Sequence, residues 1–307
     1  MGRNIYIELT NTCTHSCDTC PHGREQQAGK SFFTPLEEIV SRIKETGAEY
    51  VTLSGGEPMM HPQIMEIIDT LAKMNVRITL LSNLYLLEKK DLADRLVPYA
   101  KVLTIVTALH SAEPSAHDAI TNTPGSFEAQ CSSIDALVKR RMNVIIKVIL
   151  SLHTCERLDD ILTLVQNRWG KYIRFNLCGM DLCGADEAAV RSTPVDFQKE
   201  GELLEEFLDR AEKWYWSDLK FFVSISEYPL CHVDPYYWNL FSKGVYGNTV
   251  YVQDGLARFS KTLRTESTCA PHASACRECM VSSLCPGFWH SIYRIYGESA
   301  VTPVKGG

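Results

Sequence analysis

Three cysteines near the start of the chain have the residue type and spacing of metal ligands. Cys13, Cys17 and Cys20 form a C-x3-C-x2-C pattern directly after an apolar, β-branched run. Thiolates grouped this closely bind zinc or an iron–sulfur cluster, whereas reduced cysteines that fill a core are usually buried singly. A closed structural zinc site needs four ligands. Three thiolates therefore predict a catalytic metal or a cluster with one open iron; a zinc knuckle that borrows His15 or His22 is the alternative.

A glycine motif follows the second apolar run. Ser54, Gly55, Gly56, Glu57 and Pro58 begin about 35 residues after the third cysteine of the pattern. Glycine lets the backbone approach a ligand closely. The motif therefore predicts a ligand-binding segment at a strand end.

A second group of cysteines lies near the end of the chain. Cys276, Cys279 and Cys285 form C-x2-C-x5-C, and Cys269 stands just upstream. A cluster held only by cysteine needs four thiolates. The three tail cysteines therefore need a partner, for which Cys231 and Cys269 are the candidates. A zinc ribbon is the alternative reading.

The first cysteine pattern and the Gly-Gly-Glu-Pro motif together resemble the radical S-adenosylmethionine (radical SAM) superfamily, over about residues 5–178. The resemblance implies that Cys13, Cys17 and Cys20 hold a [4Fe-4S] cluster whose open iron binds SAM. It also implies that an electron splits SAM into methionine and a 5′-deoxyadenosyl radical, which abstracts hydrogen from an unactivated C–H bond. A flavodoxin or ferredoxin type of electron donor is implied as well.

The resemblance also suggests which residues contact SAM. The Gly-Gly-Glu-Pro segment is expected to hold its methionine amino group, and polar or apolar residues after later strands are expected to face it. A purely structural role is the alternative for the residues outside the motif. The predicted SAM contacts are Ser54, Gly55, Gly56, Glu57, Pro58, Ser82, Asn83, Ser111, Lys147 and Leu150.

The tail resembles the auxiliary-cluster extensions called twitch or SPASM domains, in which one cysteine precedes a hairpin and the others follow it. The resemblance favours Cys231 over Cys269 as the fourth ligand of one auxiliary [4Fe-4S] cluster. The further C-x3-C of a full SPASM domain is lacking. Some relatives that invert a stereocentre return hydrogen from a thiol, so Cys178 and Cys183 are candidate hydrogen donors, as is Cys269 if it is not a ligand.

Alternating strand-like and helix-like segments must position these residues. Such alternation predicts a parallel α/β sheet, either a barrel or an open doubly wound sheet, with its chemistry at the carboxyl ends of the strands. The resemblance favours a partial (β/α)6 barrel of the TIM type, at residues 1–180, with a small iron–sulfur domain at 181–307. Predicted strands are 5–9, 50–54, 76–81, 101–107, 143–151 and 172–178; predicted helices are 35–46, with Thr34 as N-cap, 62–74, 88–96, 126–141 and 158–168.

The later part of the chain is predicted to be less regular. A helix is expected over 196–216, a strand over 221–226 and a hairpin over 248–259, whose turn contains Asp254-Gly255. These elements are assigned to the second domain.

Composition limits the partners. The chain has 307 residues, with 31 Lys and Arg against 37 Asp and Glu and a net charge of −6. An acidic protein is a poor partner for nucleic acid or an anionic membrane. We find neither a secretory signal nor an apolar run long enough to span a bilayer. A cytoplasmic protein with reduced thiols is therefore expected.

These observations predict a radical SAM oxidoreductase, with two substrate classes in competition. One is a small polar natural-product intermediate, such as an aminoglycoside or another sugar, which is epimerised or dehydrogenated. The other is a ribosomally made peptide, which is epimerised or cross-linked. The chain starts at its first strand, without room for a leader-binding domain, which favours the small molecule. A zinc-binding scaffold is the non-enzyme alternative, but it does not explain the Gly-Gly-Glu-Pro motif.

Overall fold

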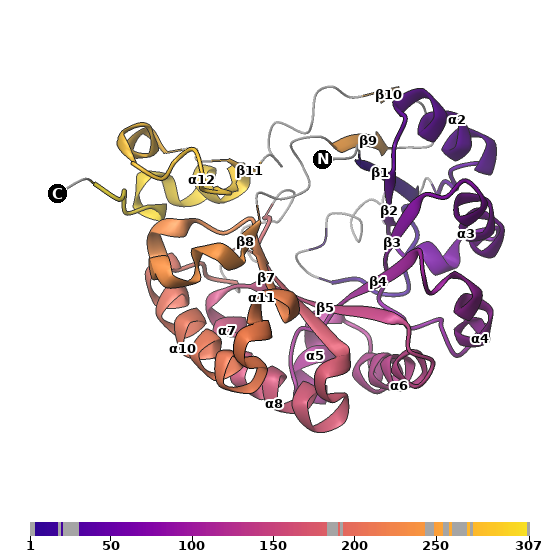
Figure 1. The fold of residues 1–307 in the computed structure, drawn as a ribbon, viewed down its shortest axis with the longest axis horizontal. Coiled ribbons are helices and arrows are strands. Elements are labelled where there is room, and N and C mark those ends of the chain that lie inside the picture. The colour runs from indigo at the N-terminus through magenta and orange to yellow at the C-terminus, as the bar shows by residue number, and fades with distance from the viewer. Residues whose placement is uncertain are drawn as a thin grey trace. The chain divides into compact units, whose positions relative to one another are not determined.

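The computed structural model describes residues 4–17, 20, 31–182, 190, 193–242, 249–253, 258–259, 269–270 and 273–305. Strands alternate with helices along most of this length (Figure 1). The strands are β1 Asn4–Thr10, β2 Tyr50–Gly55, β3 Arg77–Leu81, β4 Leu103–Ala108, β5 Asn143–Leu150, β6 Ile173–Gly179, β7 Val223–Ser226, β8 Phe241–Ser242, β9 Thr249–Gln253, β10 Arg258–Phe259, β11 Cys269–Ala270 and β12 Phe288–Trp289. The main helices are α2 Leu36–Thr46, α3 Ile64–Lys73, α4 Leu92–Leu96, α5 Pro114–Thr121, α6 Ser126–Lys139, α7 Leu152–Cys155, α8 Leu158–Arg168, α10 Phe197–Tyr215, α11 Leu219–Phe222 and α12 His290–Tyr296.

The strands form an open sheet that follows chain order. Strands β1 to β8 are neighbours in sequence order, β9 lies beside β1, and β10 pairs with β9. Strands β1–β4 pair in parallel, as do β6–β8. The predicted α/β class and partial barrel are confirmed. The sheet extends beyond the six predicted strands because β7 and β8 continue it.

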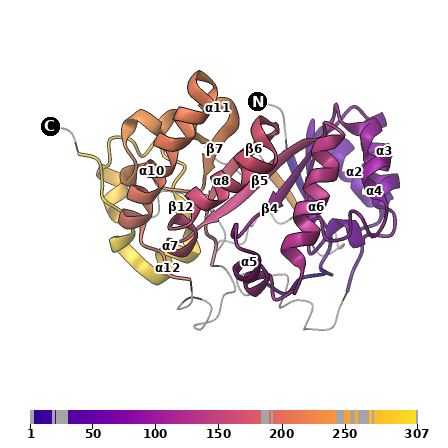
Figure 2. The same cartoon turned by 90° about the horizontal axis from the view of Figure 1, so that it is seen from below.

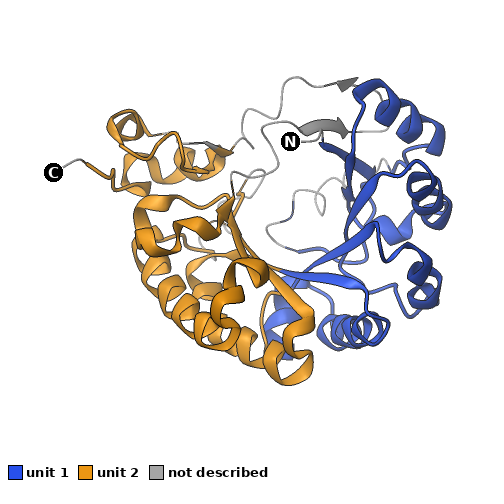
Figure 3. Cartoon of the chain, in the orientation of Figure 1, with its two compact units in different colours: residues 1–108, 113–146, 248–262 blue, residues 109–112, 147–247, 263–307 orange. Residues whose placement is uncertain are grey.

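The described chain divides into two compact units (Figure 3). Unit 1 comprises residues 1–108, 113–146 and 248–262, and unit 2 comprises 109–112, 147–247 and 263–307. Each unit contains several strands and its own buried side chains. The division at residue 180 that the sequence suggested stays a prediction about domains.

Strands β1 and β2 contribute completely buried apolar side chains to the core of unit 1. Ile5, Ile7 and Leu9 of β1 are completely buried, as are Val51 and Leu53 of β2. Burial of such side chains stabilises a fold by about 1.5–3 kcal/mol each. Helices α2, α3, α4 and α6 run along one side of β1–β4 (Figures 1 and 2), which leaves the ends of the strands free for the loops that carry function.

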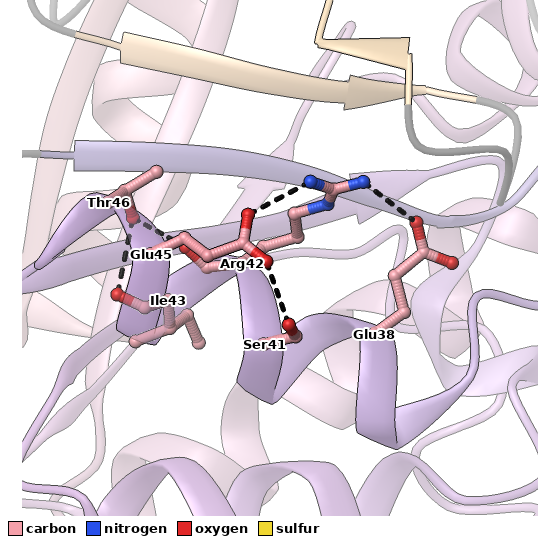
Figure 4. A network of polar contacts seen from close by, with 6 residues as sticks. All are labelled: Glu38, Ser41, Arg42, Ile43, Glu45 and Thr46. Atoms are coloured by element: carbon pink, nitrogen blue, oxygen red, sulfur yellow. Dashed lines mark hydrogen bonds and ion pairs between the residues drawn. The ribbon is translucent and has the colours of Figure 1, made fainter.

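Helix α2 shows how sequence sets the ends of an element. Gly47 ends the helix in the left-handed conformation that glycine adopts readily. The expected N-cap was wrong, because Pro35 is the N-cap and the Thr34 hydroxyl donates instead to the Glu8 carbonyl at 2.6 Å. The Arg42 side chain, which is only 13% exposed, forms ion pairs with Glu38 at 4.0 Å and with Glu45 at 3.0 Å (Figure 4). Ion pairs at this spacing on a helix add about 0.3 kcal/mol each.

Unit 2 is held together by helix α10 against β6 and β7. Phe207 of α10 and Phe175 of β6 meet edge to face with ring centroids 5.9 Å apart, and both rings are buried. Aromatic pairs in this geometry are favourable because ring edges are positive and ring faces negative. Asp196 caps the helix by accepting a hydrogen bond from the Lys199 amide at 3.1 Å.

Several expected elements differ from the structure. Helix α4 is confined to Leu92–Leu96, while turns occupy residues 85–91. Helices α5 and α7 were not expected, because both are too short to show an apolar period. Strands β9 and β10 pair antiparallel, as in the predicted hairpin, whose Asp254-Gly255 turn lies outside the described residues. Strand β9 also pairs in parallel with β1 in unit 1 and not within the second domain. No described helix is long and apolar enough to cross a membrane.

Candidate functional site

The first cysteine group lies on the loop that follows β1. Cys13, Cys17 and Cys20 are all half-buried. The Cys13 sulfur accepts hydrogen bonds from the His15 amide at 3.4 Å and from the Asn83 side-chain nitrogen Nδ2 at 3.6 Å. Burial raises the pKa of the Cys13 thiol to about 12; ligation of a metal requires and stabilises the thiolate.

Contacts from the end of α5 hold this loop in place. Asn122 Nδ2 donates to the Ser16 carbonyl at 2.9 Å, and His15 Nδ1 lies 3.0 Å from Thr123 Oγ1. The His15 ring also meets the Tyr85 ring edge to face. His15 is therefore engaged by the chain itself, and the other proposed zinc-knuckle histidine, at position 22, lies outside the described residues.

The glycine motif packs against the backbone just before the cysteines. The Gly56 amide donates to the Thr10 carbonyl and the Glu57 amide to the Thr12 carbonyl, both at 2.7 Å. A Cβ on Gly55 would lie 2.1 Å from the Thr10 oxygen, and one on Gly56 would lie 2.1 Å from the Thr12 oxygen. Only glycine permits this approach. The motif thus also fixes the start of the cysteine loop, a role that the sequence did not suggest.

Glu57 links this motif to the end of β3. Its side chain is completely buried, and it accepts hydrogen bonds from the Met59 amide, the Ser82 hydroxyl and the Asn83 amide, each at 2.8 Å. Burial raises the pKa of Glu57, and these hydrogen bonds oppose that shift. Since the Asn83 side chain contacts Cys13, the Glu57 carboxylate holds a residue that contacts the cysteine loop.

The donor set of unit 1 suits an iron–sulfur cluster with one open position. It offers three thiols on one loop, two N–H donors directed at a sulfur, and a backbone cradle that any added Cβ would fill. N–H contacts of this kind tune cluster potentials. Among the described residues, no three His, Cys, Asp or Glu side chains converge closely enough to hold a single metal ion.

Three of the predicted SAM contacts belong to unit 2. Ser111 is buried after β4. Lys147 and Leu150 are both on β5, but they are three positions apart, so their side chains leave the strand on opposite faces. Leu150 is on the buried face, whereas Lys147 is half-buried on the other.

Cys178, a predicted hydrogen donor, lies at the end of β6 beside an acidic residue that we did not predict. Its sulfur donates to Glu227 Oε2 at 2.6 Å, and Ser226 donates to the same oxygen at 2.6 Å. Burial, and then the charge of Glu227, raise the pKa of the Cys178 thiol to about 12, while Lys147 opposes that shift. The thiol therefore carries its hydrogen at neutral pH. Cys183 lies outside the described residues.

Polar side chains of β6 and β7 continue from this pair. Asn176 is directly opposite Ser224, and Cys178 is opposite Ser226. Asn176 Nδ2 donates to Ser224 at 3.2 Å and to Ser226 at 3.4 Å. Alternate residues of a strand share a face, so these side chains form one polar face. That alternation was visible in the sequence and is the signal that could have indicated it.

Four cysteines of unit 2 line one small pocket. Cys231, on the 3-10 turn Leu230–His232, lines it together with Cys276, Cys279 and Cys285. Cys269 is not among the lining residues; it is in β11 and donates to the Pro286 carbonyl at 3.4 Å. The four half-buried thiols are the number that a closed four-iron cluster needs.

Backbone amides surround two of these sulfurs. Cys285 Sγ accepts from the Leu230 amide at 3.4 Å and from the Gly287 amide at 3.3 Å. Burial raises the pKa of Cys231 to about 11, and a hydrogen bond from the Thr302 backbone opposes the shift. N–H donors to sulfur are typical of cluster ligands, so this donor set fits such a group.

Comparison with known proteins gives a family and a fold. The family model described as the radical SAM superfamily matches residues 7–166, which is more than half of the chain. The antilisterial bacteriocin subtilosin biosynthesis protein AlbA of Bacillus subtilis (strain 168) is 26% identical over 45% of this chain and 31% of its own length. A probable GTP 3′,8-cyclase of Thermococcus kodakarensis is 30% identical over 44% of each protein.

The structure of SuiB from Streptococcus suis bound to the precursor peptide SuiA superposes with a TM-score of 0.57 at 15% identity. This match covers 69% of this chain and 47% of SuiB, and it supports the fold alone. The chain spans less than half of the length of the relatives named here.

Proposed function

We propose that this chain, which belongs to the radical SAM superfamily, is an enzyme that epimerises a peptide substrate. We also propose that the enzyme holds a second, auxiliary [4Fe-4S] cluster. The observation that carries the proposed reaction is the buried, protonated Cys178 thiol at the end of β6. An epimerase must return a hydrogen atom after it has removed one, and a thiol that keeps its hydrogen is suited to that step.

Unit 1 is the proposed site for SAM cleavage. When bound, a [4Fe-4S] cluster supplies the electron that splits SAM into methionine and the 5′-deoxyadenosyl radical, which abstracts hydrogen. The chain's own part is to hold the ligands: Asn83 contacts the Cys13 sulfur, and Glu57 fixes Asn83. A flavodoxin or ferredoxin is the proposed electron donor. The proposed ligands are Cys13, Cys17 and Cys20, and the proposed SAM contacts are Ser54, Gly55, Gly56, Glu57, Pro58, Ser82, Asn83, Ser111, Lys147 and Leu150.

The auxiliary cluster is proposed for the pocket of unit 2. Cys231, Cys276, Cys279 and Cys285 would hold it, because all four line that pocket and Cys269 does not. Amide donors to Cys285 support this assignment. Such a cluster would supply electron transfer. Cys269, released from ligation, stays a second candidate for a reactive thiol, together with Cys183.

A peptide is the proposed substrate because AlbA, a relative by sequence, is named for the biosynthesis of a bacteriocin. The small polar intermediate favoured by the sequence remains the second candidate. A relative whose name is that of a GTP cyclase supports a small polar substrate. Both candidates use the same hydrogen abstraction and differ only in the molecule that carries the C–H bond.

Deuterium uptake from D2O tests the proposed reaction and its substrate together. The reduced, reconstituted enzyme is incubated with SAM and either a short precursor peptide or a sugar intermediate, each identified from genes adjacent to the gene for this chain. The proposal predicts one deuterium at one inverted Cα of the peptide. Uptake only by the sugar would overturn the peptide assignment, and uptake by neither would overturn epimerisation.

A further inference from the structure

Glu227 and Cys178 form a buried carboxylate–thiol pair at the ends of β7 and β6. The exposed fraction is 3% for Cys178 and 4% for Glu227. A carboxylate that leaves water is costly unless hydrogen bonds compensate for the lost solvation. Here the Oε2 atom accepts from the Cys178 sulfur and from the Ser226 hydroxyl.

The backbone on both sides of the pair is fixed. Glu227 has φ of +52°, a left-handed backbone conformation that residues other than glycine rarely adopt. A Cβ on Gly179 would lie 1.8 Å from the Glu227 carbonyl oxygen. The Trp289 indole donates to the Gly179 carbonyl at 2.9 Å. The ends of β6 and β7 are therefore packed so closely that thiol and carboxylate have little freedom to separate, and backbone strain of this kind is commonly found at functional sites.

The buried Cys178 thiol needs a route for protons, and the hydrogen bonds around it offer one. A thiol with 3% exposure has little direct access to bulk water. Glu227 is the acid in hydrogen-bond contact with that thiol, and Ser226 and Asn176 extend the hydrogen-bonded chain along β7 and β6. Lys147 on β5 supplies the opposing charge and also forms a side-chain hydrogen bond with the Cys178 thiol. Asp181, Cys269 and Cys285 are further titratable groups close by.

We propose that Glu227 is a positioning residue that returns a proton to Cys178 after each hydrogen transfer, so that one thiol serves many turnovers. This inference rests on the proposed role of Cys178 in epimerisation. The Cys178 S–H bond breaks homolytically and its hydrogen atom forms the new C–H bond of the product, which leaves a sulfur radical. One electron from a reduced iron–sulfur centre reduces the sulfur radical. One proton, which the Glu227 carboxylate takes up from solvent and passes to the sulfur, restores the thiol and leaves Glu227 as the carboxylate again.

The first test is independent of turnover. The S–H infrared stretch of Cys178 is identified in the reconstituted protein by its absence in Cys178→Ser. Glu227→Gln is expected to shift that band to higher frequency, because the amide is a weaker acceptor than the carboxylate. Glu200→Gln is the matched control, since Glu200 is a buried acid of the same unit that contacts the Asp196 amide. An unshifted band in Glu227→Gln would overturn the inference and leave the proposed function intact.

The second test counts turnovers. Because the resting thiol already holds its hydrogen, Glu227→Gln is expected to complete about one epimerised product per chain at the normal rate and then slow by at least tenfold. Glu227→Asp should restore repeated turnover in part, and Glu200→Gln should behave as the unmodified enzyme. Loss of the first turnover in Glu227→Gln, or many turnovers at the normal rate, would overturn the inference. Absence of labelled product with unmodified enzyme would overturn the proposed function and the inference with it.

Discussion

Glu57 shows how one buried side chain joins a ligand motif to a metal-binding loop. The sequence identified it only as part of Gly-Gly-Glu-Pro. In the structure its carboxylate accepts three hydrogen bonds and holds Asn83, which contacts Cys13. Glu57 was therefore predicted only to bind SAM, and the structure adds a second role, which is to hold Asn83 beside the cysteine loop. No local pattern could show this link, because the partners are 25 and 26 residues away.

Glu200 predicts a pH-dependent stability. It is buried on α10, its Oε2 atom has no hydrogen-bond partner among the described residues, and burial raises its pKa from 4.5 to about 7. The folded protein therefore binds this proton more tightly than the unfolded chain. The contribution of this proton to the free energy of unfolding is complete below about pH 4.5. It is lost as pH rises through about 7, which lowers the free energy of unfolding by up to about 3 kcal/mol.

Urea unfolding at pH 5 and pH 8 measures this effect. Glu200→Gln should flatten the decline in the free energy of unfolding between these two values. Glu202→Gln, at an exposed position of the same helix, should retain it. The assignment fails if Glu200→Gln and the unmodified protein decline equally.

The residues that prediction missed share a physical cause. Groups of cysteines can be predicted as ligands from sequence, because closely spaced thiolates have few roles other than binding a metal or a cluster. Glu227 follows a serine at the end of a short strand, a context that resembles any solvated turn. Only the pairing of β6 with β7 places it against Cys178. The contact between Glu227 and Cys178 is therefore determined by strand order and not by local sequence.

At the scale of elements, the close approach of β2 to the cysteine loop makes Gly56 irreplaceable. A Cβ there would lie 2.1 Å from the Thr12 carbonyl oxygen, a backbone atom that cannot rotate away. Gly56→Ala should lower the free energy of unfolding by about 2 kcal/mol or more. Because Thr12 precedes Cys13, iron retained in unit 1 should also fall.

Gly170→Ala is the matched control for this substitution. Gly170 has φ of +59°, but no atom lies within 4 Å of its added Cβ. Its cost should be about 1 kcal/mol, from the left-handed conformation alone, with iron content unchanged. Equal effects of the two substitutions on iron content would contradict the proposed role of Gly56.

Most strands and long helices were predicted because their apolar periods are strong. Helix α3, for example, begins at Ile64 where an apolar period was visible from 62 onward. The failures are short elements and caps. Helix α5 has eight mostly small or polar residues, and Thr34 binds a strand carbonyl instead of capping α2. Tertiary contacts determine both the formation of α5 and the cap of α2, and local sequence propensity does not include such contacts.

At the scale of the whole molecule, the predicted class and partial barrel hold, and long-range pairing is what the sequence did not show. Strand β9 pairs with β1 although more than 240 positions separate them. Alternation of strands and helices indicates parallel neighbours along the chain. It carries no information about a late strand that joins the first one.

The two cysteine sets predict the total iron content. Anaerobic reconstitution should give roughly eight irons per chain if each set holds a four-iron cluster. Cys231→Ala should halve this number, because Cys231 lines the pocket with the three tail cysteines, and Cys269→Ala should leave it unchanged. The reverse result for these two variants would assign Cys269 as the fourth ligand.

Formation of 5′-deoxyadenosine is the most direct measure of the central claim. The reconstituted protein is reduced anaerobically in the presence of SAM, and the nucleoside is quantified by chromatography. We expect 5′-deoxyadenosine from the unmodified chain and from Cys269→Ala, and its loss in Cys17→Ala. A protein that binds zinc but no iron and forms no 5′-deoxyadenosine would contradict the account.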